Sequence, residues 1–213
     1  KNQDITLFSP NDVPDLYEAY GTKEFDDLYI KYENSHISKR KISAQKVFFD
    51  ILKERAETGR IYIMNIDHAN EHSAFKSQIK MSNLCQEITL PTDPIQHIDG
   101  RGEIALCILS AVNVGTLEKL KDLEEICDLS VRALDEIIDH QNYPVKAAEI
   151  STRRRRSLGI GYIGLAHYLA RKGVKYSDKK AWEEVDRLSE AFQYYLLEAS
   201  TNLAKEKGRC EYF

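Results

Sequence analysis

Residues 82–88, with the sequence SNLCQEI, place an amide, a thiol and a carboxylate at every second position, as Asn83, Cys85 and Glu87. In an extended strand, alternate side chains project to the same side, so these three would share one face. A lone strand cysteine is most often a small buried hydrophobe. Burial of Asn83 and Glu87 beside it would leave an unpaired carboxylate in the interior, which is costly and usually indicates a function. The pattern therefore predicts a reactive site.

The surrounding chain has the composition of a soluble globular protein. It has 213 residues, of which 42% are hydrophobic, enough to bury a real core. The 30 basic and 34 acidic side chains are well mixed and give a formal net charge of -4. This charge predicts neither a nucleic acid nor an anionic membrane as partner. No run approaches the roughly 20 apolar residues of a membrane helix, and the first residues are too polar for a signal peptide, so a cytoplasmic location is expected.

Four cysteines, at positions 85, 107, 127 and 210, are spread along the chain without C-x-x-C spacing. This usage fits a reducing compartment better than a secreted disulfide framework or a zinc module. Any disulfide in this chain is therefore expected to be transient.

Hydrophobic periodicity predicts strands alternating with helices, which is typical of a largely parallel sheet or barrel with helices outside it. Strands are expected at residues 5–8, 60–66 and 103–109. Helices are expected at about residues 13–20, 43–56, 117–140, 163–171 and 181–207. Gly59, Gly173 and Gly208 stand just past the ends of three of these helices, where glycine commonly ends a helix.

Residues 68–72, HANEH, fit the H-x-x-E-H pattern of a zinc protease. That site requires a helix, so that His68 and His72 share one face with Glu71. Here the motif follows a predicted strand, and Asp67 and Asn70 are turn formers. A polar loop is therefore the favoured interpretation over a metal site.

Residues 159–164, GIGYIG, fit the G-x-G-x-x-G pattern of a dinucleotide site. Such a site requires a buried strand directly before the glycines and an acidic residue at the end of the next strand. The preceding residues, STRRRRS, are not a buried strand, and neither Asp178 nor Asp186 is so placed. The favoured interpretation is a tight packing point between a strand and a helix.

The four consecutive arginines at residues 153–156 leave two interpretations open. They could bind phosphate or the carboxylates of a partner, because guanidinium groups form paired hydrogen bonds with both. A short run of charge is more often a solvated segment.

Longer stretches resemble a known family. SNLCQEITLPT at residues 82–92, followed by GEIALCILSAVNVG at 102–115, is similar to the active-site region of the large subunit of class Ia ribonucleotide reductase. The similarity extends in the same order through residues 2–17, 58–70, 155–161 and 192–208, with the sequences NQDITLFSPNDVPDLY, TGRIYIMNIDHAN, RRSLGIG and FQYYLLEASTNLAKEKG. The resemblance implies a ten-stranded α/β barrel of two antiparallel halves, with a finger loop through its middle. Residues 1–213 would be the central portion of this one barrel domain, an incomplete barrel, with Cys85 at the tip of the loop.

The same resemblance implies roles for single residues. Cys85 would be the thiyl radical that takes the 3′ hydrogen of the substrate ribose, and Glu87 the general base for the 3′ hydroxyl. Asn83 would hydrogen-bond the substrate hydroxyls, with Ser82 also at the substrate. Cys107 would be one member of the redox pair that forms a disulfide at each turnover. Cys127 and Cys210 match no site position and are expected to be structural.

The resemblance also implies partners and cofactors. The chain would bind no cofactor itself, because a diiron-tyrosyl small subunit supplies the radical, and ATP and deoxynucleotide effectors bind elsewhere in the full subunit. Further partners would be a second large subunit, thioredoxin or glutaredoxin, and a nucleoside diphosphate substrate. The family's other segments, including the partner cysteine of Cys107, are not recognisable here. We therefore expect either a truncated fragment or one product of a split gene, which in both cases requires the remaining segments of the large subunit and is inactive alone.

Overall fold

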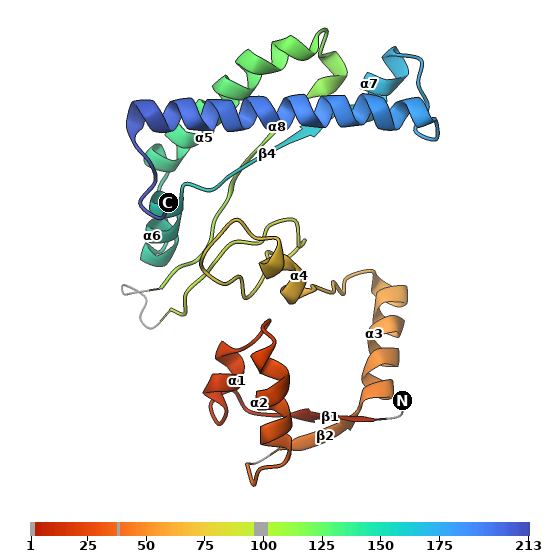
Figure 1. The fold of residues 1–213 in the computed structure, drawn as a ribbon, viewed down its shortest axis with the longest axis vertical. Coiled ribbons are helices and arrows are strands. Elements are labelled where there is room, and N and C mark those ends of the chain that lie inside the picture. Colours follow the sequence, from red (N-terminus) through yellow and green to blue (C-terminus); the bar gives the residue numbers. More distant parts are fainter. Residues whose placement is uncertain (1–2, 38, 96–101) are drawn as a thin grey trace. The chain divides into compact units, whose positions relative to one another are not determined.

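A computed structural model describes residues 3–37, 39–95 and 102–213 of the chain (Figure 1). The chain divides into two compact units, Lys1–Thr92 and Asp93–Phe213. Each unit has its own elements and its own buried side chains.

The first unit contains a small antiparallel sheet and four helices. Strand β1 (Asp4–Leu7) pairs with β2 (Arg40–Ser43), with Asp4 opposite Ser43 and Leu7 opposite Arg40. The helices of this unit are α1 (Pro14–Glu18), α2 (Glu24–Glu33), α3 (Ala44–Thr58) and α4 (Ile66–Glu71). The predicted strand at residues 5–8 and the helices at 13–20 and 43–56 are confirmed, whereas α2 and β2 were not predicted.

The two ends of α3 follow from its sequence. The Ser43 hydroxyl accepts a hydrogen bond from the Lys46 backbone amide at 3.3 Å, which satisfies one amide that has no partner inside the helix. At the other end Gly59 adopts a left-handed backbone, with φ of 66°, and closes the helix through its amide to the Arg55 carbonyl. Only glycine takes this conformation without steric cost, so the predicted stop is confirmed.

The strand predicted at residues 60–66 is wrong. Residues 60–65 form no strand, Ile66 begins α4, and Tyr62 and Ile63 are 51% and 60% exposed. A strand is stabilised by backbone hydrogen bonds to a neighbouring strand. No such neighbour pairs with residues 60–65 within the part of the chain that the structure describes.

Asn70 ties α4 to the chain that follows it. Its side-chain amide donates to the carbonyls of Ile66 and Ile79, at 2.9 and 2.8 Å, and its oxygen accepts from the Ile79 amide at 2.8 Å. Ile66 and Ile79 are both buried. The segment leading to Cys85 is therefore fixed at its base without regular secondary structure.

The second unit contains two parallel strands and four α-helices. In order these are β3 (Ile108–Asn113), the 3₁₀ turns η1 (Val114–Thr116) and η2 (Leu120–Asp122), α5 (Leu123–His140), α6 (Lys146–Arg155), β4 (Leu158–Ile163), α7 (Leu165–Arg171) and α8 (Lys179–Lys207). The predicted helices that end at His140, Arg171 and Lys207 are confirmed, although α5 begins at Leu123 after two 3₁₀ turns. Helix α6 was not predicted.

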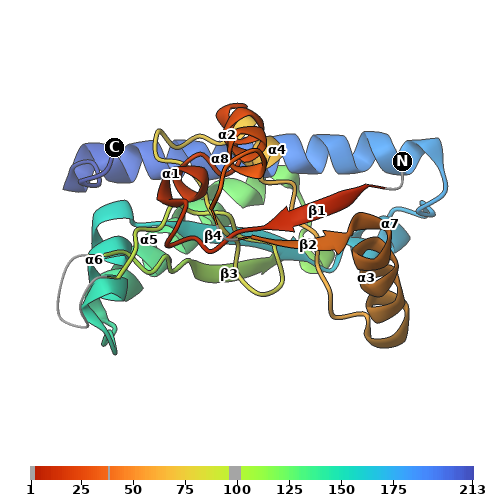
Figure 2. The same cartoon turned by 90° about the horizontal axis from the view of Figure 1, so that it is seen from below.

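The two strands of this unit are covered by helices on one face. β3 and β4 run side by side in Figure 2, with Ile108 opposite Leu158. Helix α8 packs against α5, as Figure 1 also shows. Their shared core includes Val112, Val114, Leu123, Cys127, Leu188 and Phe192, with Ile160 and Tyr162 packed against it.

The third predicted strand, at residues 103–109, is shifted. β3 begins at Ile108, because its partner β4 begins at Leu158, after α6 ends at Arg155. Among the described residues, residues 103–107 pair with no strand and make only a single bridge, between Glu103 and Asp93.

The described residues thus form a two-stranded antiparallel sheet and a two-stranded parallel sheet with helices, and they do not form a closed barrel. This agrees with the incomplete barrel that was expected. None of the described helices is both long and apolar enough to span a bilayer.

Candidate functional site

Cys85 lies at the tip of a tight turn. The Gln86 amide donates to the Asn83 carbonyl at 3.2 Å, which closes a four-residue turn with Leu84 and Cys85 at its centre. Gln86 then takes a left-handed backbone, with φ of 62°. A non-glycine residue in this conformation costs about 1 kcal/mol, so surrounding contacts must hold the turn.

Asn83 supplies those contacts. Its backbone amide donates to the Ile88 carbonyl at 3.2 Å, and its side-chain oxygen accepts from the Ile88 backbone amide at 3.1 Å. The Ser82 hydroxyl donates to the Asn83 carbonyl at 2.9 Å. Asparagine commonly builds turns in this way, because its short amide can replace a backbone partner. These bonds use the side-chain oxygen of Asn83, and its side-chain N–H donors take no part in them.

The strand alternation inferred for residues 82–88 is therefore wrong. Asn83, Cys85 and Glu87 are all exposed, and Leu84 is 86% exposed. The burial argument for a reactive carboxylate fails for the same reason, because the turn formed by Asn83 interrupts the extended backbone. The position of Cys85 at a loop tip agrees with the resemblance.

Cys107 lies directly before β3. Cys107 is two residues before Leu109, so the two side chains project to the same face of the strands. Leu109 is 58% exposed, because α5 and α8 pack against the opposite face. The thiol is partly buried, and this burial raises the pKa of Cys107. A Cβ atom at Gly159 of β4 would lie 2.9 Å from the Cys107 sulfur.

The four consecutive arginines pair inside the chain. Arg155 donates to Glu103 at 2.7 Å, and both side chains are almost fully buried, at 9% and 5% exposed. Arg154 lies 3.3 Å from Glu211. The pairing of Arg155 differs from both a phosphate clamp and a solvated run, because a buried charge requires a partner of opposite sign.

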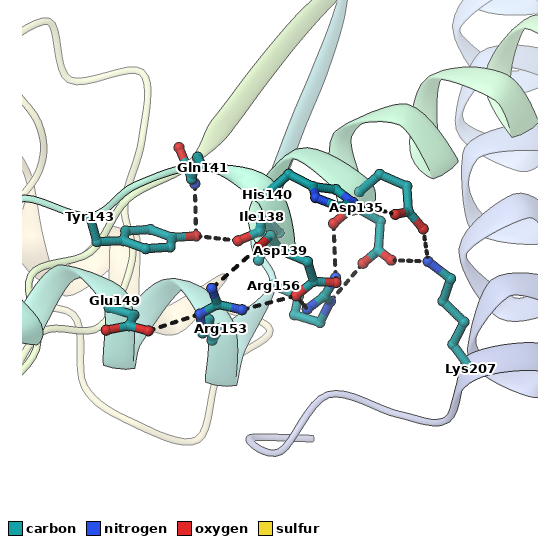
Figure 3. A network of polar contacts seen from close by, with 11 residues as sticks. Asp135, Ile138, Asp139, His140, Gln141, Tyr143, Glu149, Arg153, Arg156 and Lys207 are labelled. Carbon is teal, nitrogen blue, oxygen red and sulfur yellow. Dashed lines mark hydrogen bonds and ion pairs between the residues drawn. The ribbon is translucent and has the colours of Figure 1, made fainter.

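Arg156 is the centre of a second network, drawn in Figure 3. Its guanidinium lies 2.6 Å from Asp135 and 2.9 Å from Asp139, both on α5, and hydrogen bonding from Arg156 lowers the pKa of Asp139. Lys207 of α8 contacts Asp135 at 3.2 Å, and Arg153 contacts Asp139 at 3.3 Å. The network joins α5, α6 and α8 immediately before β4.

Gly159 and Gly164 lie at close packing points, as predicted for this motif, whereas a Cβ at Gly161 would meet nothing within 4 Å. Gly159 and Gly161 lie inside β4 rather than in a loop after a strand, which excludes the dinucleotide geometry at these residues. Gly164 is the N-cap residue of α7, with φ of 80°, and a Cβ there would collide with the side-chain oxygen of Asn113 and lie 2.9 Å from the Gly115 nitrogen. Both the backbone and the space thus require glycine at Gly164.

The H-x-x-E-H motif is helical rather than a loop. His68 and Glu71 lie within α4, and His72 is its last cap residue. The expected polar loop is therefore wrong: Asn65 is the N-cap residue, without a side-chain capping bond, and the Asn70 side chain bonds the Ile66 carbonyl of the helix rather than building a turn. The described residues bring together no group of three or more side chains suited to a metal.

Cys127 is fully buried in the core of the second unit, and burial raises its pKa to about 11. Its thiol is therefore inert at neutral pH, as the structural interpretation requires. Cys210 is partly buried near the end of the chain.

Two features near the candidate residues were not anticipated. The space that Gly159 leaves beside Cys107 depends on the parallel register of two strands that are far apart in sequence. The contacts between Asp135 and Arg156 depend on the unpredicted helix α6. The sequence did contain a signal for the contact between Asp135 and Arg156: Asp135 is an acidic residue on the buried side of an amphipathic helix, and a run of arginines follows that helix.

Comparison with known proteins gives matches over the whole chain. The family model "Ribonucleotide reductase, barrel domain" matches residues 1–213. The ribonucleoside-diphosphate reductase subunit alpha of Buchnera aphidicola subsp. Schizaphis graminum is 56% identical over 99% of this chain, and that of Haemophilus influenzae is 56% identical over 100%. The ribonucleoside-diphosphate reductase 1 subunit alpha of Escherichia coli is 50% identical over 100% of this chain.

In each of these three relatives, the chain spans 29% of the relative's length. The matching family model covers every residue that carries the turn at Cys85 and the strand next to Cys107. The chain therefore belongs to the ribonucleotide reductase barrel-domain family.

Proposed function

We propose that this chain is the central part of the catalytic barrel of a ribonucleoside-diphosphate reductase, in which both units belong to one ten-stranded barrel domain. The reaction would convert ribonucleoside diphosphates to 2′-deoxyribonucleoside diphosphates. One observation carries the proposal: a chain that is 56% identical to reductase alpha subunits holds an exposed thiol at the tip of a tight, fixed turn. The names of the relatives support the reaction class.

Cys85 is proposed as the radical centre. Its thiyl radical takes the hydrogen from C3′ of the ribose and returns it once the 2′ position is reduced, so this thiol is regenerated in each cycle. The position at a turn tip, flanked by the 86% exposed Leu84, supports this role, because the sulfur can approach a substrate without a steric barrier from its own loop.

Three neighbours of Cys85 are proposed to act on the substrate. Glu87 accepts the proton of the 3′ hydroxyl, which eases loss of the 2′ oxygen. Asn83 donates a hydrogen bond from its amide nitrogen to the ribose hydroxyls, while its oxygen remains bonded to the Ile88 amide at 3.1 Å. Ser82, whose hydroxyl donates to the Asn83 carbonyl at 2.9 Å, would also contact the substrate. A rigid turn supports such roles, because fixed donors lose little entropy on binding.

Cys107 is proposed as a reductant. Each turnover removes the 2′ hydroxyl as water and requires two electrons and two protons, which two thiols supply as they form one disulfide. Cys107 is one of these thiols, and the other lies in a segment of the large subunit outside this chain. Thioredoxin or glutaredoxin then reduces the disulfide by thiol exchange.

The remaining components are proposed from the same family membership. A diiron-tyrosyl small subunit generates the radical, a second large subunit completes a homodimer, and ATP and deoxynucleotide effectors bind in other segments of the subunit. The chain itself binds no cofactor, and it is inactive without those segments. A cytoplasmic location fits the need for a reducing partner.

The experiment is a reconstitution. This chain would be mixed with the flanking segments of a large subunit, the small subunit and a dithiol, and formation of deoxycytidine diphosphate would be measured. We expect product only when the chain is present, and loss of dithiol-supported turnover in Cys107→Ser, with Cys210→Ser as the matched control. Turnover of Cys107→Ser at the parent rate would refute the role of Cys107.

A further inference from the structure

The sulfur of Cys107 lies over a strand position that has no side chain. In the parallel register of β3 and β4, Leu109 is opposite Gly159. A Cβ at Gly159 would lie 2.9 Å from the Cys107 sulfur and 2.5 Å from Cδ2 of Leu109. Unbonded heavy atoms normally remain about 3.5 Å or more apart, so the sulfur occupies space that any other residue would fill.

The backbone does not explain the glycine. Gly159 is absent from the glycines with a left-handed backbone, so an L-residue could adopt its conformation. Gly161 lies two residues further along β4 and on the same face, yet a Cβ there would meet nothing within 4 Å. The crowding at Gly159 is therefore specific to Cys107 and Leu109 and is not a general property of the strand.

We propose that Gly159 is a positioning residue for the Cys107 thiol: its missing side chain is the space that lets the sulfur lie on the uncovered face of β3 and β4. The importance of this position for a redox cycle rests on the proposed function. The placement of the sulfur itself does not rest on the proposed function, because it follows from the register of β3 and β4 and from the two distances to a Cβ at Gly159.

An added methyl group at Gly159 would act differently on its two neighbours. Leu109 is 58% exposed, and its side chain can rotate away. Cysteine has a single side-chain torsion, so the sulfur must leave its place or be covered by the methyl. Burial already raises the pKa of Cys107, and further covering lowers both its thiolate fraction and its access to reagents.

The test measures the rate at which iodoacetamide alkylates Cys107 in the whole chain, followed by peptide mass spectrometry. In Gly159→Ala we expect a rate about threefold or more below that of the parent. Gly161→Ala is the matched control, because it adds the same methyl to the same face of the same strand, and its rate should equal that of the parent. Cys210 in each molecule serves as the internal reference.

Two further variants separate a direct effect on the sulfur from an effect through Leu109. The rate of alkylation should fall by the same factor when Gly159→Ala is added to the Leu109→Ala variant as when it is added to the parent chain. If Gly159→Ala fails to fold, the comparison is made in the Leu109→Ala background, where the contact with Leu109 Cδ2 is gone, and there Cys107→Ala should restore folding, since the contact with sulfur is then also gone.

Three outcomes would overturn the proposal. Cys107 of Gly159→Ala could be alkylated at an unchanged or faster rate, Gly161→Ala could slow alkylation as much as Gly159→Ala, or Gly159→Ala could have no effect on alkylation in the Leu109→Ala background. Failure of Gly159→Ala to fold in the background that carries both Cys107→Ala and Leu109→Ala would do the same. These outcomes concern the position of the thiol, whereas dithiol-supported turnover of Cys107→Ser concerns the reductase reaction, so the two proposals fail separately.

Discussion

Arg156 shows how one side chain can fix several elements. It ends α6 in a left-handed backbone, with φ of 49°, and its guanidinium contacts Asp135 and Asp139 of α5. Asp135 is only 8% exposed, so its charge depends on Arg156 and Lys207 for compensation. The ion pairs offset the cost of the strained backbone at the point where the chain turns from α6 into β4.

We expect Arg156→Met to lower the free energy of unfolding of this region by about 2 kcal/mol, because it leaves the buried carboxylate of Asp135 with Lys207 alone. The measurement is hydrogen exchange of the α5 amides at neutral pH. Arg153→Met is the control, because that arginine and its partner Asp139 are 40% and 42% exposed. It should change the free energy of unfolding by less than about 0.5 kcal/mol. Equal exchange in the two variants would contradict this account.

At the residue scale, the local sequence pattern did not predict the backbone around Cys85, whereas the resemblance implied a loop tip there. The alternation of Asn83, Cys85 and Glu87 suggested a strand, but the structure forms a turn in which Asn83 bonds the Ile88 amide. Whether asparagine supports a strand or builds a turn depends on which backbone partners are near, and the local pattern does not contain that information.

Helix α8 illustrates packing at the scale of an element. Its buried residues, which include Leu188, Phe192 and Ala199, recur at helical spacing and face α5 and the strands, whereas Leu197 is 58% exposed. One face of this helix therefore packs against α5 and contributes to the core against which Ile160 and Tyr162 of β4 pack.

We expect Leu188→Ala to cost about 2 to 5 kcal/mol of unfolding free energy, because Leu188 is fully buried and its loss leaves a cavity. Urea unfolding followed by circular dichroism measures this. Leu197→Ala removes the same atoms from an exposed position of the same helix and should change the value by less than about 0.5 kcal/mol. A similar loss in both variants would mean that α8 does not pack as described.

Helices were predicted better than strands, and the reason is physical. The hydrogen bonds of α3, α5 and α8 are local, and their apolar periodicity is visible in sequence, as are the glycines that end α3 and α8. A strand exists only where a second strand runs beside it. Residues 60–66 look like a strand but have no partner among the described residues, and β3 begins only where β4 is available.

At the scale of the whole molecule, the charges of the second unit matter most, because five of its carboxylates form ion pairs that lower their pKa. Hydrogen bonding from Lys207, Arg156, Lys146, Lys172 and Arg132, respectively, lowers the pKa of Glu136, Asp139, Glu149, Glu184 and Glu206. A group whose pKa is lower in the folded state stabilises the fold fully above its unfolded pKa. That contribution is lost as the pH falls through the folded value.

We therefore expect the free energy of unfolding to be level near neutral pH and to fall progressively below about pH 4.5, where the unfolded carboxylates begin to bind protons. Urea unfolding at successive pH values from 7 to 3 measures this. Arg156→Met should show a shallower fall, because Asp139 loses the partner that lowers its pKa. A stability that stays constant or rises between about pH 5 and pH 3 would contradict the ion-pair account.

The central claim is that the thiol at the turn tip, Cys85, performs radical chemistry in an assembled reductase. The most direct measurement is deoxycytidine diphosphate formation by the reconstituted enzyme carrying Cys85→Ser in this chain. Serine fills the same space, so the turn held by Asn83 should be kept, but its O–H bond is too strong to exchange hydrogen with the ribose.

The account predicts no detectable product with Cys85→Ser, while Cys210→Ser retains the activity of the parent chain. Assembly with the other segments should be unchanged in both variants. Product formation by Cys85→Ser at a rate comparable to the parent would contradict the claim and place the radical centre elsewhere.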